Sequence, residues 1–182
     1  YILLSTADKR PYTPADEINT HVIEWLDNRD TDDPFFAWVH YMDTHYPFYQ
    51  DGEMLKKIDA DQISSAEQRN VNRLMNESPE KLDEDDINTL TTLYDAETRF
   101  TDMEIGHFLD ALRERELYDN TVIIITSDHG EALGEHGGFG HYKALYEELF
   151  RVPLVIHVPT QASTTIDTQV GLVDLEPTIL DY

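Results

Sequence analysis

The sequence predicts an α/β fold in which a mostly parallel sheet is flanked by helices. Two apolar runs, residues 35–42 and 121–127, have the continuous apolar character of strands that are covered on both faces. A long helical pattern over residues 86–116 leads through a short turn into the second run. Both runs end in acidic and histidine side chains. Because ligands in open α/β sheets bind beyond the carboxyl ends of strands, these two ends predict one functional site.

Composition restricts the class of protein. The chain has 182 residues, enough for one domain with a core, and 37 acidic residues against 13 basic ones give a net charge of −24. This excess argues against a nucleic-acid-binding protein, which needs basic patches, and against docking on an anionic membrane. A halophilic protein, whose acidic surface is screened by salt, is one explanation. The alternative is a disordered acidic tail, but 40% hydrophobic residues argue against it.

The sequence leaves the compartment open. It contains no cysteine, so disulfide usage carries no information, and no signal peptide is visible. No apolar run approaches the roughly 20 residues that cross a bilayer, so we expect no membrane-spanning segment. The chain does not begin with Met, and residues 1–4 resemble the end of a strand or a loop. We therefore expect an excerpt of a longer protein.

The first predicted helix extends to about residue 28. Pro14 suits a first helical turn, and Asp16 and Glu17 lie near the positive end of the helix dipole. Apolar residues then recur at helical spacing, which predicts one buried face.

The run 35–42 ends shortly before Pro47, a residue that breaks a strand ladder. We therefore expect His45 at or just past the end of a buried strand, with Asp43 orienting the turn. His40 lies an odd number of positions from His45, so it should point to the opposite face, in the core or behind the site.

Residues 50–86 are polar and charged, and we interpret them as a solvated acidic insertion with helical pieces around residues 60–76. The following pattern over residues 86–116 is the clearest helix of the chain, because its apolar residues recur near the helical period. Its acids, Glu97 among them, could be mistaken for metal ligands; we expect them on a solvated helix face.

The carboxyl-terminal half repeats the order of helix, turn and strand. We expect a turn at residues 117–121, a strand at 121–127, a helix at 144–150, a buried strand at 152–159, and a short helix from Pro177.

The stretch from Ser127 to Lys143 carries most of the chemistry. Asp128 offers a hard oxygen and His129 a borderline nitrogen, and adjacent ligands at a strand-to-loop bend can converge on one divalent cation. The later histidines and the lysine would suit an anionic substrate such as a sulfate or phosphate ester. The alternative is that Asp128 caps the next helix and the histidines lie in a solvated loop. The density of glycine, histidine and acid argues against that alternative.

Five segments of the chain resemble the carboxyl-terminal signature of the sulfatase family, which belongs to the alkaline-phosphatase-like superfamily of metal-dependent hydrolases. They are residues 35–48, 127–131, 134–137, 145–154 and 173–180. The resemblance implies that residues 1–182 are part of an alkaline-phosphatase-like catalytic domain. It also implies a hydrolase of sulfate esters, with a small-molecule or glycan ester as the substrate.

The resemblance implies a role for five side chains. Asp128 and His129 match metal ligands; Ca²⁺ is most usual in the family, and Mn²⁺, Mg²⁺ or Zn²⁺ are possible. Many sulfatases have Asn in the place of His129, whereas the phosphonate-hydrolase and phosphodiesterase branches have His. His45 matches a histidine that contacts the ester. The family usually has Lys where this chain has His141, so His141 and then Lys143 are expected to contact the ester oxygens.

The family nucleophile is a formylglycine made in a Cys/Ser-x-Pro-x-Arg motif, and no such motif occurs in this chain. We expect the nucleophile and a pair of metal-binding aspartates upstream, so that the chain alone would be inactive. One alternative is a phosphodiester or phosphonate hydrolase, or a phosphoethanolamine-type transferase, on the same fold. A second is an acidic binding domain without catalytic activity.

Overall fold

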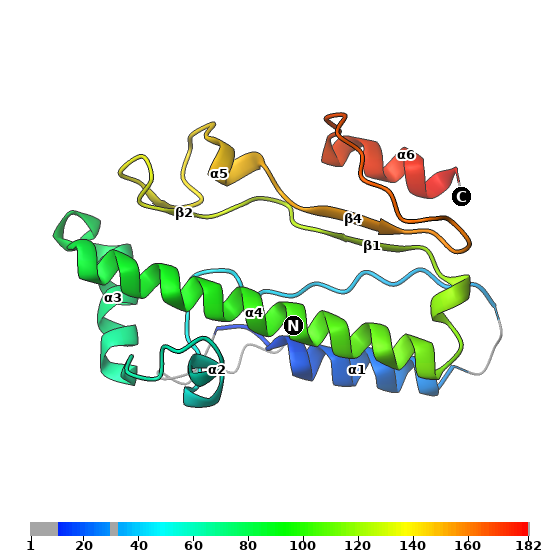
Figure 1. Cartoon of the computed structure of the whole chain (residues 1–182), viewed down its shortest axis with the longest axis horizontal. Coiled ribbons are helices and arrows are strands. Elements are labelled where there is room, and N and C mark those ends of the chain that lie inside the picture. Colours follow the sequence, from blue (N-terminus) through cyan, green and yellow to red (C-terminus); the bar gives the residue numbers. More distant parts are fainter. Residues whose placement is uncertain (1–10, 30–32, 182) are drawn as a thin grey trace.

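The computed structural model describes residues 11–29 and 33–181, so the expected strand end at residues 1–4 lies outside the described part. Figure 1 shows a layer of helices on one side and a layer of strands with two short helices on the other. The helices of the first layer are α1 Ala15–Asp27, α2 Gly52–Lys57, α3 Ser65–Glu77 and α4 Glu84–Glu114. The second layer contains β1 Ile123–Thr126, β2 Ala132–Leu133, β3 Phe139–Gly140, α5 Glu147–Phe150, β4 Leu154–His157 and α6 Leu175–Leu180. Short 3-10 turns occupy Pro79–Lys81, Tyr118–Asn120 and Leu172–Asp174.

Local signals explain the helices. A capping box between Asp83 and Asp86 begins α4, and another between Ser64 and Glu67 begins α3. Along α4, apolar residues at helical spacing turn Leu90 and Leu93 inward, where both are completely buried. The predictions of helices near residues 15–28 and 86–116 are confirmed.

The interpretation of residues 50–86 as a solvated insertion is wrong. Five members of the hydrophobic core come from this segment: Met54, Leu55, Ala60, Val71 and Met75. They pack with Phe48 and with the buried face of α4. The acidic composition concealed them, because a short amphipathic helix needs few apolar residues, and Val71 and Met75 are one turn apart.

Glu97 is likewise buried rather than solvated. Its side chain is completely inaccessible and accepts hydrogen bonds of 2.8 Å from the backbone N–H of Tyr49 and from Nε2 of Gln50. Buried carboxylates need such partners. Glu97 thus ties α4 to the segment that follows His45.

The strand layer confirms the α/β class but corrects the strand direction. β1 pairs with β4, with Ile123 opposite His157 and Thr126 opposite Leu154, and β2 pairs with β3. Both pairings are antiparallel, so the expectation of a mostly parallel sheet is wrong for the strands described. The return from β1 to β4 passes the β2–β3 hairpin and the four-residue helix α5, not a long crossover helix packed on the sheet.

The run 35–42 is extended but forms no strand, and the prediction of a buried strand is wrong. Figure 1 shows it passing between the two layers. Phe36 and Trp38 are 70% and 78% exposed, and His40 is exposed instead of lying in the core. An apolar composition favours burial, but a strand also needs a neighbouring strand with which to form backbone hydrogen bonds. None of the described residues pairs with this run.

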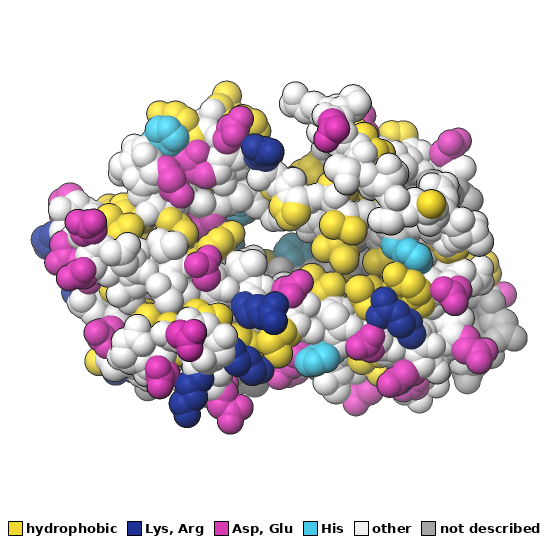
Figure 2. Space-filling view, viewed as in Figure 1, with side chains coloured by type: hydrophobic (Ala, Val, Ile, Leu, Met, Phe, Trp, Pro, Cys, Tyr) yellow, Lys and Arg dark blue, Asp and Glu magenta, His cyan; other side chains and the backbone are white. Residues whose placement is uncertain are grey.

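Acidic side chains are scattered over the face shown in Figure 2, which is hollowed between the two layers. Among the residues that the structure describes, no helix combines the length and the apolar character that crossing a membrane requires.

Candidate active site

The hollow between the layers has a volume of about 270 Å³ and is lined by three parts of the chain. Residues 40–45, without Asp43, form one wall, Tyr94 of α4 lies at another, and residues 127–131 form the third. The ends of the two apolar runs therefore meet at one place, as the sequence predicted.

The 127–131 loop is held tightly against the segment that leads into β4. The Thr126 hydroxyl donates to the carbonyl oxygen of Pro153 at 2.9 Å, and the Gly130 N–H donates to that of Leu149 at 2.8 Å. A Cβ atom at Gly130 would lie 2.0 Å from the carbonyl oxygen of Glu148. Only glycine permits this close approach of two backbones.

The loop presents Asp128 and His129 at the mouth of the hollow. Nδ1 of His129 lies 2.8 Å from the carbonyl oxygen of Gly130, so Nδ1 carries the hydrogen and Nε2 is the free nitrogen. That nitrogen lies 3.9 Å from Oδ2 of Asp128, whose side chain is 77% exposed. A carboxylate oxygen and an imidazole nitrogen thus face one another without a direct hydrogen bond.

His45 is placed by the helical layer. Asp43 is fully buried and accepts a hydrogen bond of 3.3 Å from the backbone N–H of Ala15, which ties the turn to the start of α1. The expected role of Asp43 in orienting the turn is confirmed. Nδ1 of His45 lies 2.6 Å from the carbonyl oxygen of Tyr46, so here too Nε2 is the free nitrogen.

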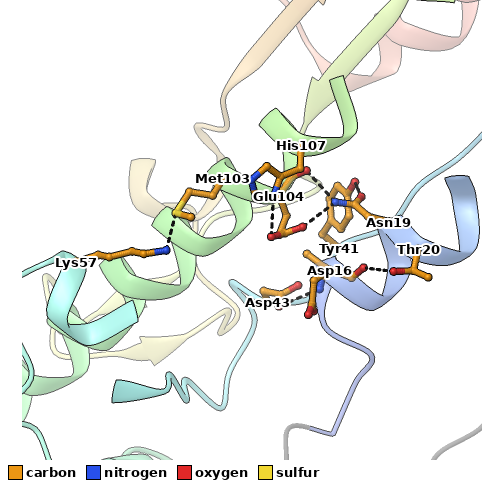
Figure 3. A network of polar contacts seen from close by, with 10 residues as sticks. Asp16, Asn19, Thr20, Tyr41, Asp43, Lys57, Met103, Glu104 and His107 are labelled. Atoms are coloured by element: carbon orange, nitrogen blue, oxygen red, sulfur yellow. Dashed lines mark hydrogen bonds and ion pairs between the residues drawn. The ribbon is translucent and has the colours of Figure 1, made fainter. Parts of the chain in front are cut away.

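Tyr41, on the same wall, is held by a second polar network (Figure 3). Its hydroxyl donates to Oδ1 of Asn19 at 2.6 Å, and Nδ2 of Asn19 donates to Oε2 of Glu104 at 3.0 Å. Nδ1 of His107 lies 3.1 Å from the other oxygen of Glu104. Burial raises the pKa of Tyr41, and the charges of Glu104 and Asp43 raise it further. This wall of the hollow is therefore anchored to both α1 and α4.

His141 completes a cluster of three histidines from three segments. The centre of its ring lies 4.5 Å from that of His129 and 5.2 Å from that of His45. Partial burial lowers the pKa of His141, and the neighbouring charges of His129 and His45 lower it further. The structure thus brings together Asp128, His129, His45 and His141.

Lys143 does not join this group. It is exposed, it does not line the hollow, and it forms no hydrogen bond or ion pair with a described side chain. His136 also lies outside the hollow. Its Nδ1 is 2.6 Å from Oε1 of Glu148, and its ring stacks on Tyr146 with the centres 3.7 Å apart. His136 thus braces the loop from outside the hollow.

The sequence analysis missed Glu131. Its side chain is only 4% exposed, lines the hollow, and accepts a hydrogen bond from the backbone N–H of Tyr46. Burial raises the pKa of Glu131, although the charges of His45 and His129 and the Tyr46 hydrogen bond oppose that shift. The signal was present, because an acid directly follows Asp128-His129-Gly130, but nothing local indicates that this acid is buried.

The donor set at the hollow fits part of a divalent metal site. Asp128 offers a carboxylate oxygen and His129 an unprotonated Nε2, and both are ordinary metal donors. Within the described ranges, no group of three or more histidine, cysteine or acidic side chains is placed to hold an ion. Divalent ions take four or more ligands, so these two residues would be part of a larger set.

Comparison with known proteins identifies the family of this chain. The family model described as Sulfatase matches residues 4–182. The chain belongs to the sulfatase family. An uncharacterized sulfatase of Escherichia coli, YidJ, is 32% identical over 178 residues, which are 93% of this chain and 36% of that protein.

Two further similarities agree. Mouse iduronate 2-sulfatase is 32% identical over 148 residues, which cover 69% of this sulfatase chain and 27% of the relative. The structure of a phosphonate monoester hydrolase from Silicibacter pomeroyi superimposes with a TM-score of 0.71 at 23% identity, covering all of this chain and 42% of that one. The alkaline-phosphatase-like fold is confirmed. The chain spans roughly a third of the length of the curated relatives that it matches.

Proposed function

We propose that residues 1–182 are part of the catalytic domain of an enzyme that hydrolyses sulfate esters with the help of a divalent metal ion. One observation carries the proposal: in a chain of the sulfatase family, Asp128, His129 and His45 line one hollow, and the His141 ring lies against those of His45 and His129. A cluster of a carboxylate and imidazoles suits a metal ion and an anionic ester.

Asp128 and His129 would hold the metal in this proposal. When bound, the ion would neutralise the charge that develops on the ester oxygens. The carbonyl of Gly130 fixes the His129 ring with Nε2 available, as a metal-binding imidazole needs. Nitrogen ligation moves the preference from Ca²⁺ towards Mn²⁺ or Zn²⁺.

His45 and His141 would contact the ester and its leaving oxygen. His45 lines the hollow with the His141 ring beside it, and the carbonyl of Tyr46 leaves Nε2 of His45 free to face a ligand. A histidine can donate a proton to a leaving oxygen and so assist bond cleavage. Lys143 would add a fixed positive charge for the ester oxygens, but its exposed position gives it a smaller part than the histidines.

A phosphonate or phosphodiester ester is the second candidate substrate. Histidine at position 129 and the similarity of fold to a phosphonate monoester hydrolase favour it. For a sulfate ester, the iduronate 2-sulfatase relative favours a sulfated glycan.

The full-length protein decides between these candidates in one assay. An aryl sulfate and an aryl phosphonate monoester are each supplied with Ca²⁺, Mn²⁺ or Zn²⁺, and then with a chelator. We expect faster turnover of the sulfate and its loss on chelation. Faster turnover of the phosphonate would favour a phosphonate ester over a sulfate ester as the substrate. No turnover of either ester with metal present would favour a non-catalytic binding domain.

Metal content tests the ligand assignment separately from turnover. We expect His129→Ala to lower the divalent metal bound per full-length protein, measured by elemental analysis after gel filtration. His136→Ala is the matched control, because His136 pairs with Glu148 outside the hollow. Equal metal content in the wild type and the His129 variant would refute the assignment.

A further inference from the structure

All three histidines of the cluster have an oxygen facing Nδ1. For His45 it is the carbonyl of Tyr46 at 2.6 Å, and for His129 it is the carbonyl of Gly130 at 2.8 Å. For His141 it is Oε1 of Glu131 at 3.9 Å. The first two contacts fix the tautomer and the direction of the ring. The third has the same arrangement at a longer distance, and its oxygen belongs to a carboxylate.

The Glu131 oxygen that faces His141 is otherwise unused. The carboxylate is buried, and Oε1 has no hydrogen-bond partner among the described residues. A buried acceptor without a partner destabilises the folded state. The Glu131 side chain also accepts a hydrogen bond from the backbone N–H of Tyr46. It packs under Gly140, where an added Cβ would lie 3.5 Å from Oε1. Glu131 therefore lies where the loops of all three histidines meet.

We propose that Glu131 is a positioning residue: its Oε1 accepts a hydrogen bond from Nδ1 of His141 and turns Nε2 of that ring toward the ester. The inference rests on the proposed function, because it assumes that His141 contacts the ester. Closing the contact from 3.9 Å to a hydrogen bond of about 2.9 Å requires a movement of about 1 Å. His141 is half exposed, and it lies in a loop, so this movement is open to it.

The consequence for the reaction is confined to His141. As the ester S–O bond breaks, its electron pair stays on the leaving oxygen, which takes the Nε2 proton of the doubly protonated His141 ring, while Nδ1 keeps its hydrogen toward Glu131. Over the whole hydrolysis, water supplies a hydroxyl group to sulfur and a proton to the histidine. Glu131 forms no bond to the substrate. It keeps the ring in the orientation from which the proton can be transferred.

Leaving-group dependence distinguishes this role from a merely structural one. In the full-length enzyme, we expect Glu131→Gln to lower kcat about 100-fold for an aryl sulfate with a poorly acidic phenol, because that phenol needs the proton. For a nitrophenyl sulfate we expect a loss of only a few-fold, with KM little changed for either ester. Equal losses for the two esters would overturn the proposal.

Glu148→Gln is the matched control. Glu148 is also a carboxylate that contacts a histidine, at 2.6 Å from His136, but it lies outside the hollow. Any loss in this variant should be the same for both esters. A double-mutant cycle adds a second criterion: combined with His141→Asn, Glu131→Gln should cause no further loss. Multiplying losses would show that Glu131 does not act through His141.

NMR spectroscopy tests the contact between Glu131 and Nδ1 of His141 without a measurement of turnover. In full-length protein with ¹⁵N-labelled imidazoles, the His141 signals, assigned with His141→Asn, should show a protonated Nδ1 in the wild type and a mixture of tautomers in Glu131→Gln. A wild-type spectrum with an unprotonated Nδ1 would overturn the inference. If the wild type hydrolysed neither ester, the proposed function would fail, and this spectrum would still decide whether Glu131 orients the ring.

Discussion

The helical layer and the strand layer bury their apolar residues to very different extents. In the helical layer, Phe48, Leu90 and Leu93 are completely inaccessible and form one continuous core. Beside it, Trp38 is 78% exposed, and Val155 of β4 is 57% exposed. Since burial of apolar surface is the main favourable term in folding, the helical layer supplies most of the stability that the described residues contain.

This difference explains how the candidate site is built. His45 follows the run between the layers, but its turn is fastened to the helical layer through Asp43 and α1. Asp128, His129 and His141 come from loops of the strand layer. One histidine is therefore held by a well-packed core, and the other side of the hollow depends on a few backbone contacts such as that of Gly130 with Leu149.

The largest effect should come from removing core volume in the helical layer. We expect Leu93→Ala to lower the free energy of unfolding of this chain by about 3 kcal/mol, because it leaves a cavity at a completely buried position. Ile156→Ala, in the partly exposed strand β4, should cost about 1 kcal/mol or less. Chemical denaturation of both variants tests the comparison, and equal losses would contradict it.

A smaller but local effect should come from the strand side of the hollow. We expect Gly130→Ala to cost about 2 kcal/mol, because its Cβ meets the backbone of Glu148 and must displace it. Thermal unfolding measures the change. The control is Gly106→Ala in α4, where nothing lies within 4 Å of the added carbon and helix propensity predicts a gain of up to about 1 kcal/mol. Opposite signs for the two glycines are the expected result.

The sequence predicted those features that local signals determine. Helical periodicity, first-turn acids and a proline placed α1 and α4 to within a few residues. The β-branched run located β1, and the acid and histidine after it line the hollow of the candidate site. The convergence of His45 with Asp128 and His129 was predicted from two strand ends meeting at one edge, but only the run before Asp128 forms a strand.

Features that depend on distant partners could not be predicted in this way. The run 35–42 has the composition of a buried strand, but pairing depends on an available edge elsewhere in the molecule. Buried Glu97 accepts hydrogen bonds from Tyr49 and Gln50, which lie 48 and 47 positions away in the sequence. Buried Glu131 depends in the same way on the distant Tyr46. A solvated acid and a buried, hydrogen-bonded acid have the same local pattern.

The smallest effect separates stability from activity at Glu131. Burial raises the pKa of this carboxyl group in the folded chain, so the folded state binds more protons than the unfolded state. Stability should then fall as the pH rises from the ordinary glutamate value, about 4.3, through the raised folded value. Glu131→Gln removes this term. With a chelator present, we expect a gain of about 2 °C or less in melting temperature at pH 8 and none at pH 4.

The sign of that difference is the informative quantity. If burial of the Glu131 charge destabilises the folded chain, removing that charge should raise the melting temperature, even as the proposed activity falls. Glu135→Gln is the control, since among the described residues that exposed carboxylate accepts a hydrogen bond from the Leu133 N–H alone and should show no gain at pH 8. A lower melting temperature for Glu131→Gln at pH 8 would mean that the charge stabilises the hollow through His45 and His129 by more than its burial costs.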